Sequence, residues 1–205
     1  MLRIIFATGN QGKMREIRAI MGECEAEIIS MKEAGLNLAI EENGTTFEEN
    51  ALIKARAVAD ALSAREEEQA CVVMADDSGL EIDCLNGEPG IYSARYLGED
   101  TPFDTKSRDF LRRMEDVPDE KRGARFVCAI AAVFPDGEEV ITKGIVEGRI
   151  GHELRGDNGF GYDPVFYLPE YGRTAAELSD EEKNQISHRS RALGLMKEEL
   201  EKRMF

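Results

Sequence analysis

The sequence has no apolar run that approaches the roughly 18 residues needed to cross a bilayer. It also lacks the pattern of a signal peptide and the composition of a transit peptide, so we expect a cytoplasmic protein without a membrane partner. Positive charge is scarce, because 26 Lys and Arg stand against 41 Asp and Glu, a net charge of −15. This balance argues against non-specific binding to nucleic acid. A phosphate-bearing ligand must therefore meet a local cluster of cations, helped by a divalent metal.

Cysteine is also sparse and shows no metal-binding or redox spacing. The four residues Cys24, Cys71, Cys84 and Cys128 form no CxxC pair and no Cys/His cluster. Three of them lie in apolar surroundings, which favours buried, reduced thiols over disulfides or zinc. The hydrophobic fraction of 42% is sufficient for a real core. A chain of 205 residues fits one large domain or two lobes that share a sheet, and we expect a single domain over residues 1–205.

The pattern of apolar residues predicts alternating strands and helices. Residues 3–7 are typical of a buried strand, and a helix follows with Met14, Ile17 and Met21 at helical spacing. The apolar run 71–75 is typical of a strand buried on both faces, which we expect to stop at Asp76. The other expected elements are a strand at 26–30, helices at 47–62 and 105–114, strands at 125–134 and 138–150 joined by a Pro-Asp-Gly turn, a solvated connection at 64–69 and a helical end of the chain. This mixture predicts an α/β fold with a mixed sheet.

The first candidate for chemistry is the junction between the first strand and the first helix. It consists of Thr8, Gly9, Asn10, Gln11, Gly12 and Lys13. Backbone N–H groups at a helix N-terminus, approached closely past glycines, form a natural phosphate cradle, and Lys13 adds a full positive charge. The alternative is an ordinary glycine turn before a helix. The spacing is not that of a Walker A loop.

The second candidate is Asp76-Asp77-Ser78-Gly79, at the expected carboxyl end of the buried strand. Paired acids at such a strand end can hold Mg²⁺ and orient or deprotonate a water molecule. The alternative is a solvated turn. Further carboxylates occur at Glu41-Glu42 and Glu48-Glu49, where acids often only favour a helix dipole. Asn50 and Lys54, one helical turn apart, can present an amide and an ammonium to one ligand, although a solvated face is the default.

Two later segments carry groups that suit a nucleobase. The loop Phe160-Gly161-Tyr162-Asp163 combines aromatic rings that can stack on a base with an acid that can accept from base N–H groups. Packing of Phe160 under the loop is the alternative. Lys183, His188 and Arg189 then place three potential cations within seven residues. A basic helix end is common by itself, and His152 has no motif around it, so we expect a surface residue there.

Taken in order, these segments resemble the Ham1/inosine-triphosphatase family, which includes the bacterial XTP/dITP diphosphatases. The matching motifs are Thr8-Gly9-Asn10 with Lys13, Thr46-Phe47-x-Glu49-Asn50-Ala51 with Lys54-Ala55, Ala75-Asp76-Asp77-Ser78-Gly79-Leu80, Pro89-Gly90-x-Tyr92-Ser93-Ala94-Arg95-Tyr96, Gly159-Phe160-Gly161-Tyr162-Asp163-Pro164-x-Phe166, and Glu177-Leu178 with Glu182-Lys183-Asn184 and Ile186-Ser187-His188-Arg189. Six motifs in the right order over nearly the whole chain are highly specific. One departure is Asn158, which stands where many relatives have glycine.

The resemblance implies an elongated mixed sheet flanked by helices, with two lobes, an active-site cleft between them and a homodimer. It implies Mg²⁺-dependent hydrolysis of non-standard purine nucleotides (ITP, dITP, XTP) to the monophosphate and pyrophosphate, which removes them from the nucleotide pool. Asp77 would be catalytic and would hold Mg²⁺ with Glu41. The residues implied to bind substrate are Thr8, Gly9, Asn10, Gln11, Gly12, Lys13 and Lys54 for the triphosphate, Ser78, and Phe160, Gly161, Tyr162, Asp163, Lys183, His188 and Arg189 for the rest of the nucleotide.

Selectivity is expected to depend on the purine 6-position. Inosine and xanthosine carry an oxygen there, which accepts hydrogen bonds, whereas adenine carries a donating amino group. A pocket that donates to this oxygen leaves two donors facing each other when ATP binds. Two alternatives stay open at this point. One is a pyrophosphatase for modified pyrimidine nucleotides, and the other is a nucleotide sensor without catalytic activity.

Overall fold

The computed structural model describes residues 2–22, 24–65 and 71–204 of the chain. It contains a seven-stranded sheet with the strand order β2-β1-β3-β4-β5-β6-β7. The chain divides into two compact units. The first unit comprises Met1–Asp77, Cys128–Gly144 and Arg189–Phe205, and the second comprises Ser78–Val127 and Ile145–His188. The expectation of a single domain over residues 1–205 stays a prediction.

Parallel and antiparallel pairs both occur in the sheet, so the predicted α/β fold with a mixed sheet is confirmed. β1 (Leu2–Phe6) pairs in parallel with β2 (Ala26–Ser30) and with β3 (Val72–Ile82). β4 (Gly123–Val133) and β5 (Glu139–Ile150) are joined by the expected tight turn, in which Phe134 N donates to Glu138 O. β6 (Phe166–Leu168) pairs antiparallel with β5 and with β7 (Arg173–Thr174).

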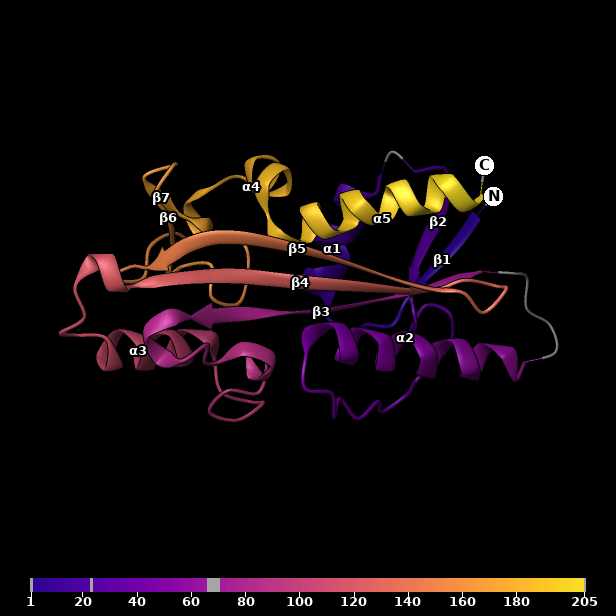
Figure 1. Cartoon of the computed structure of the whole chain (residues 1–205), viewed down its shortest axis with the longest axis horizontal. Helices are drawn as coiled ribbons and strands as arrows, with labels where there is room; N and C mark the ends of the chain where they lie inside the picture. The colour runs from indigo at the N-terminus through magenta and orange to yellow at the C-terminus, as the bar shows by residue number, and fades with distance from the viewer. Residues whose placement is uncertain (1, 23, 66–70, 205) are drawn as a thin grey trace. The chain divides into compact units, whose positions relative to one another are not determined.

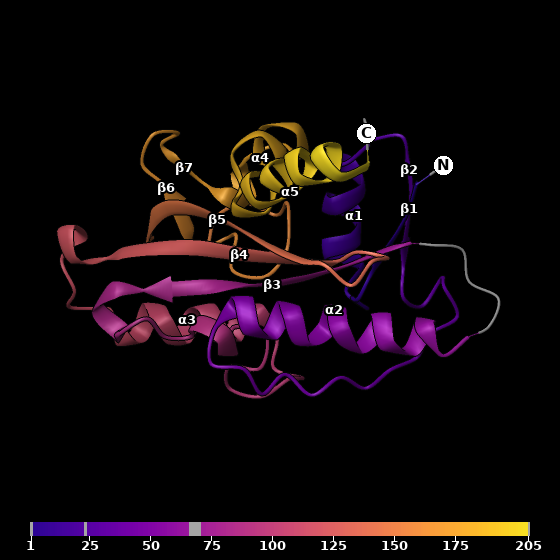
Figure 2. The same cartoon turned by 45° about the vertical axis from the view of Figure 1, so that its right-hand side comes forward.

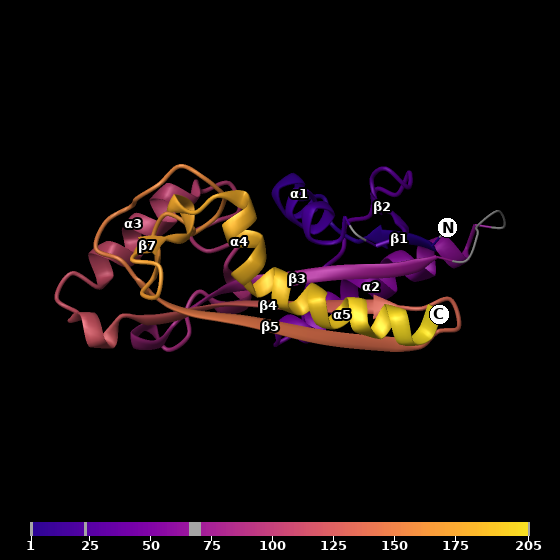
Figure 3. The same cartoon turned by 90° about the horizontal axis from the view of Figure 1, so that it is seen from above.

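In the first unit, helices cover both faces of the strands (Figures 1 and 2). α1 (Gln11–Ile20) and α5 (His188–Met204) pack on one face, where Met14, Ile17 and Leu193 join the buried side chains of Val72 and Met74. α2 (Phe47–Ser63) covers the other face. Figure 3 shows α5 lying along β5, and Thr142 Oγ1 donates to the Ala192 carbonyl over 2.8 Å. Each face of β3 in this unit therefore meets a different helix.

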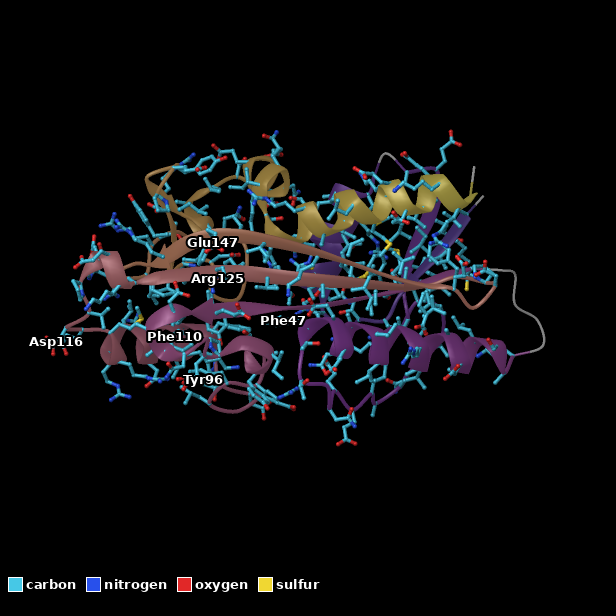
Figure 4. The ribbon with its side chains drawn as sticks, viewed as in Figure 1. Phe47, Tyr96, Phe110, Asp116, Arg125 and Glu147 are labelled. Atoms are coloured by element: carbon cyan, nitrogen blue, oxygen red, sulfur yellow. The ribbon has the colours of Figure 1, made fainter. Side chains whose placement is uncertain are left out.

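The second unit has its own core, built around α3 (Phe103–Arg113) and α4 (Asp180–Ile186). The rings of Tyr96 and Phe110 stack at 4.8 Å, on the side of β3 that α3 covers (Figure 4). Arg125 of β4 and Glu147 of β5 form an ion pair at 3.0 Å on neighbouring strands (Figure 4). Short 3₁₀ turns complete the unit at Asp83–Leu85, Gly90–Tyr92, Asp119–Lys121 and Ala175–Glu177.

One predicted boundary is wrong in a way that matters for the site. We expected the buried strand to stop at Asp76, but β3 continues to Ile82, with Leu80 and Ile82 fully buried. Asp76 and Asp77 therefore lie in the middle of a strand, where successive side chains point to opposite faces. Each acid forms an ion pair with a mostly buried cation, Asp76 with Arg189 and Asp77 with Lys54, so the two acids do not mark a solvated strand end.

Other expectations are confirmed with small shifts. The helix expected at 105–114 spans Phe103–Arg113, while β6, β7 and α4 were not predicted. The connection expected at 64–69 lies outside the described residues from position 66 onward. No helix within the described part of the chain is long and apolar enough to cross a bilayer.

Candidate active site

The junction between β1 and α1 forms an open helix N-terminus. Asn10 is the N-cap, and its Oδ1 accepts the backbone N–H of Lys13 over 3.0 Å. Thr8 Oγ1 in turn accepts the N–H of Asn10 over 3.1 Å, which holds the loop in shape. A side-chain carbon added at Gly9 would meet nothing within 4 Å, so the space in front of the loop is open. Because the first N–H groups of a helix have no acceptor within it, this junction suits an anion.

Lys13 is held by a carboxylate that has no contact with solvent. Its ammonium donates to Oδ1 of Asp76, whose side chain is 0% exposed, while that of Lys13 is 16% exposed. Oδ2 of Asp76 accepts from Arg189 Nε at 2.8 Å and from the Cys128 thiol at 3.1 Å. Burial alone would raise the pKa of Asp76, but the charges of Arg189 and Lys13 hold it well below its usual value. Asp76 is therefore a fixed negative charge.

Arg189 lies elsewhere than the resemblance suggests. We expected it among the residues around the nucleotide, but its side chain is 2% exposed and pairs with both Asp76 and Glu16 of α1. The Arg189 guanidinium thus neutralises part of the charge of Asp76, the carboxylate that also holds Lys13. Sequence reasoning missed Glu16 and Cys128, because neither stands in a recognisable motif.

Asp77 points to the other face of β3, toward α2. Its Oδ1 accepts from Lys54 Nζ over 3.2 Å, and Lys54 also donates to Glu42 over 2.5 Å. The second oxygen, Oδ2, is buried and has no hydrogen-bond partner among the described residues. Burial raises the pKa of Asp77, and Lys54 and Lys13 offset this only in part, because Glu42 and Asp76 repel the carboxylate. The pKa of Lys54 is raised, since Asp77 and Glu42 outweigh the cost of its burial.

The acid that contacts Lys54 beside Asp77 is Glu42, whereas the resemblance implies a role for Glu41. Glu41, the implied metal ligand, is exposed, whereas Glu42 is half-buried and contacts Lys54. Asn50 of α2 helps to shape this segment, because its Oδ1 accepts the N–H of Gly44 over 2.9 Å. No pattern in the sequence distinguishes the two adjacent glutamates. Among the described residues, no group of three or more His, Cys, Asp or Glu side chains is arranged to hold a metal ion.

A second cluster forms in the second unit around the loop at 159–163. Asp163 is buried and accepts both Lys183 Nζ at 2.5 Å and the backbone N–H of Phe160 at 2.9 Å. The Lys183 ammonium also lies over the Phe160 ring, 5.1 Å from its centroid. Gly159 has a φ of +78°, and a side-chain carbon there would overlap Asp163. The loop therefore depends on glycine to bring the acid and the lysine together.

Only one of the two aromatic rings in this loop is available for stacking. Tyr162 is 3% exposed, and its ring meets Phe103 edge-on at 5.0 Å. Its hydroxyl donates to the Ser93 carbonyl over 2.7 Å, and burial raises its pKa. Tyr162 therefore anchors the loop from inside, whereas the half-buried Phe160 can still offer its ring.

His188 belongs to the same cluster and is also mostly enclosed. Its ring stacks on Phe126, with centroids 4.9 Å apart and planes inclined by 20°. Asp163, Lys183 and His188 border a cavity of about 20 Å³, which otherwise has mainly apolar walls. A volume of this size holds about one water molecule.

The predicted site residues therefore form two clusters. The triphosphate cluster, in the first unit, contains Thr8, Gly9, Asn10, Gln11, Gly12, Lys13, Lys54, Asp76, Asp77 and Arg189, with Glu42. The base cluster, in the second unit, contains Phe160, Asp163, Lys183 and His188. Ser78 is half-buried and lies in the second unit. In the sequence, Asp77 of the first unit is followed directly by Ser78 of the second, and His188 of the second by Arg189 of the first.

Comparison with known proteins gives full-length matches. The model of the Ham1 family matches residues 4–199. A dITP/XTP pyrophosphatase from Caldanaerobacter subterraneus is 47% identical over 205 residues, which cover 100% of this chain and 98% of the relative. One from Clostridium perfringens is 45% identical over 200 residues and covers 98% of both chains. The solved Ham1 protein of Staphylococcus aureus superposes with a TM-score of 0.84 at 43% identity, covering 97% of this chain and 98% of the other.

Proposed function

The chain belongs to the Ham1 family, and we propose that it hydrolyses the non-standard purine nucleotides ITP, dITP and XTP to the monophosphate and pyrophosphate. The relatives that share its full length are named dITP/XTP pyrophosphatases. One observation on this chain carries the proposal. Asp77 has one oxygen on Lys54, its other oxygen is buried without a hydrogen-bond partner among the described residues, and the charges of Lys54 and Lys13 both favour its ionised form.

The triphosphate cluster supplies what cleavage of a phosphoanhydride requires, which is positioning and charge neutralisation more than covalent chemistry. The loop from Thr8 to Lys13 offers backbone N–H groups, and Lys13 and Lys54 offer two ammonium groups. Asp77 is the acid that activates the attacking water, and its Oδ1 already accepts from Lys54.

We propose Mg²⁺ as the cofactor, held by Asp77 and by an acid of the Glu41-Glu42 pair. The unpartnered, buried Oδ2 of Asp77 fits a cation, as does the hard oxygen chemistry of the neighbouring acids. The absence of a three-ligand group among the described residues is compatible with this metal, which is commonly held by one or two carboxylates and by substrate phosphates. When bound, Mg²⁺ would offset charge on the triphosphate.

The base cluster suits a 6-oxo purine. Phe160 offers a ring for stacking, and Asp163 holds the Lys183 ammonium, an obligate hydrogen-bond donor, beside this ring. Asp163 already accepts two hydrogen bonds and fixes the orientation of the lysine. A donor held in this way favours an oxygen over an amino group at the 6-position. Tyr162 and Arg189 act from inside the protein, the former on the loop and the latter on Asp76.

The test is pyrophosphate release from ITP, XTP, GTP and ATP, each measured with Mg²⁺ and with EDTA. We expect metal-dependent release from ITP and XTP, with GTP and ATP nearly inert. Equal and poor turnover of all four would contradict the proposed substrates, and modified pyrimidine nucleotides would be the next to test. Tight binding of ITP without turnover would instead indicate a sensor.

We further propose a homodimer that acts in the cytoplasm on the nucleotide pool, as the resemblance implies. Light scattering coupled to size exclusion measures the mass directly. A single species near twice 22.8 kDa is expected, whereas a species at 22.8 kDa at micromolar concentration would contradict the dimer.

A further inference from the structure

Lys13, Arg189 and Cys128 are among the donors to the buried carboxylate of Asp76, and Cys128 has no part in the function proposed above. Lys13 and Arg189 are charged donors, and the thiol of Cys128 lies 3.1 Å from Oδ2. Cys128 lies on β4, the neighbour of β3 in the sheet, and is 0% exposed. Of these four residues, only Lys13 reaches solvent appreciably.

The geometry around Asp76 gives each donor a separate task. Lys13 approaches Oδ1, while Arg189 and Cys128 both approach Oδ2. Two donors on one oxygen fix the rotation of the carboxylate, and this rotation determines where Oδ1 holds the ammonium. Burial raises the pKa of the Cys128 thiol well above its usual value, so the sulfur keeps its proton and acts as a donor.

We propose that Cys128 is a positioning residue of the triphosphate cluster. The hydrogen bond from its thiol fixes the orientation of Asp76, and Asp76 in turn directs the Lys13 ammonium toward the substrate's phosphates. The inference rests on the proposed function, because it assumes that Lys13 meets a triphosphate. Here the thiol is directed at a charged acceptor, an arrangement stronger than a hydrogen bond between neutral groups.

The experiment compares Cys128→Ala, which removes the donor, with Cys128→Ser, which keeps one. Ile130→Val is the matched control, because it removes a similar volume from the same strand and the same apolar core. The steady-state KM and kcat for ITP are measured with the melting temperature of each variant. We expect Cys128→Ala to raise KM about fivefold with kcat little changed, as the loss of about one hydrogen bond implies. Cys128→Ser should stay within about twofold of the wild type for the same reason, and Ile130→Val should change only the melting temperature.

The KM values of Cys128→Ala and Cys128→Ser, compared with each other, distinguish a positioning role of Cys128 from a packing role. If Cys128 only packed, a buried hydroxyl would be no better than a methyl group, and KM would not distinguish alanine from serine. Equal KM values for the wild type and Cys128→Ala, or equal increases in both variants, would overturn the inference. Wild-type protein that does not hydrolyse ITP would instead contradict the proposed function, so the two failures are distinguishable.

A spectroscopic measurement tests the same contact even if Cys128→Ala folds poorly. The infrared S–H stretching band of Cys128 is identified as the band that Cys128→Ser loses. A hydrogen bond from the thiol to a carboxylate lowers the frequency of this band. We expect it to shift to higher frequency in Asp76→Asn, and an unchanged band would contradict the contact.

Discussion

Lys54 Nζ lies 3.2 Å from Oδ1 of Asp77, while Oδ2 of the same carboxylate is buried without a hydrogen-bond partner among the described residues. Leaving one oxygen of a buried carboxylate unsatisfied costs stability, because the group has lost water and gained nothing on that side. Glu42 and Asp76 add repulsion to this cost. Such an arrangement is typical of a functional site, where a side chain is positioned to bind a ligand at a cost to the stability of the fold.

Asp77→Asn tests whether this carboxylate performs the chemistry. We expect the variant to bind ITP with similar affinity but to lose about 10²–10⁴-fold in kcat, the usual contribution of a general base. The measurement is kcat by pyrophosphate release together with nucleotide binding by calorimetry. Asp60→Asn, an exposed acid on α2, serves as the control and should behave like the wild type. Full activity of Asp77→Asn would exclude the assigned role.

Glu42→Gln and Glu41→Gln separate the acid that the structure favours from the acid that the resemblance implies. Glu42 holds Lys54 at 2.5 Å, whereas Glu41 is exposed, so we expect Glu42→Gln to be the more damaging change. Its loss in kcat/KM should be about 10–100-fold, as is usual for groups that support a metal or its ligands. The Mg²⁺ concentration for half-maximal activity, measured for both variants, decides between them. A larger effect of Glu41→Gln would restore the assignment based on resemblance.

Much of the fold was predictable, because periodicity and turn chemistry report local structure directly. The strand at 26–30 and the hairpin turn before Glu138 were predicted at or very near their observed positions. β3 shows where such reasoning fails. Two adjacent acids resemble a solvated strand end, and only the tertiary contacts with Lys13 and Lys54 make them compatible with the middle of a buried strand.

The motifs do not record what each side chain of the proposed site touches. Tyr162 and Arg189 stand in matching motifs, yet both are buried and hold other protein groups. Cys128 has no motif and nevertheless contacts Asp76. Such contacts join residues far apart in the sequence, for example 113 positions between Asp76 and Arg189. No local pattern records them.

Asp76→Asn should make stability less dependent on pH. The folded pKa of Asp76 is well below its usual value, so its ion pairs stabilise the fold fully above the unfolded pKa of about 3.9 and less as pH falls below it. Near neutral pH, we expect the variant to lose about 3–5 kcal/mol in the free energy of unfolding, because Lys13 loses the carboxylate that holds it and Arg189, which keeps its ion pair with Glu16, loses the buried one. Urea titrations of both proteins at several values between pH 7 and pH 2 measure the difference. This difference should shrink below about pH 4, and a constant difference would contradict the charge-based explanation.

Gly159→Ala should disturb the base cluster, and Gly87→Ala is the control that separates overlap with Asp163 from backbone strain. Gly159 and Gly87 both have a positive φ, +78° and +84°, so alanine strains the backbone at either position by about 1–2 kcal/mol. At Gly87 the new carbon would meet nothing within 4 Å, whereas at Gly159 it would overlap Asp163 and lie 3.0 Å from Lys183 Nζ. Both variants should lose the stability that this strain costs, and Gly159→Ala should lose more, because only there must Asp163 and Lys183, the pair that we propose to face the base, be displaced. We expect its kcat/KM for ITP to fall about 10–100-fold, because small displacements of positioning groups are costly, while Gly87→Ala stays near the wild type. Equal losses of activity in both variants would mean that backbone strain alone is responsible and that the Asp163–Lys183 pair does not select the base.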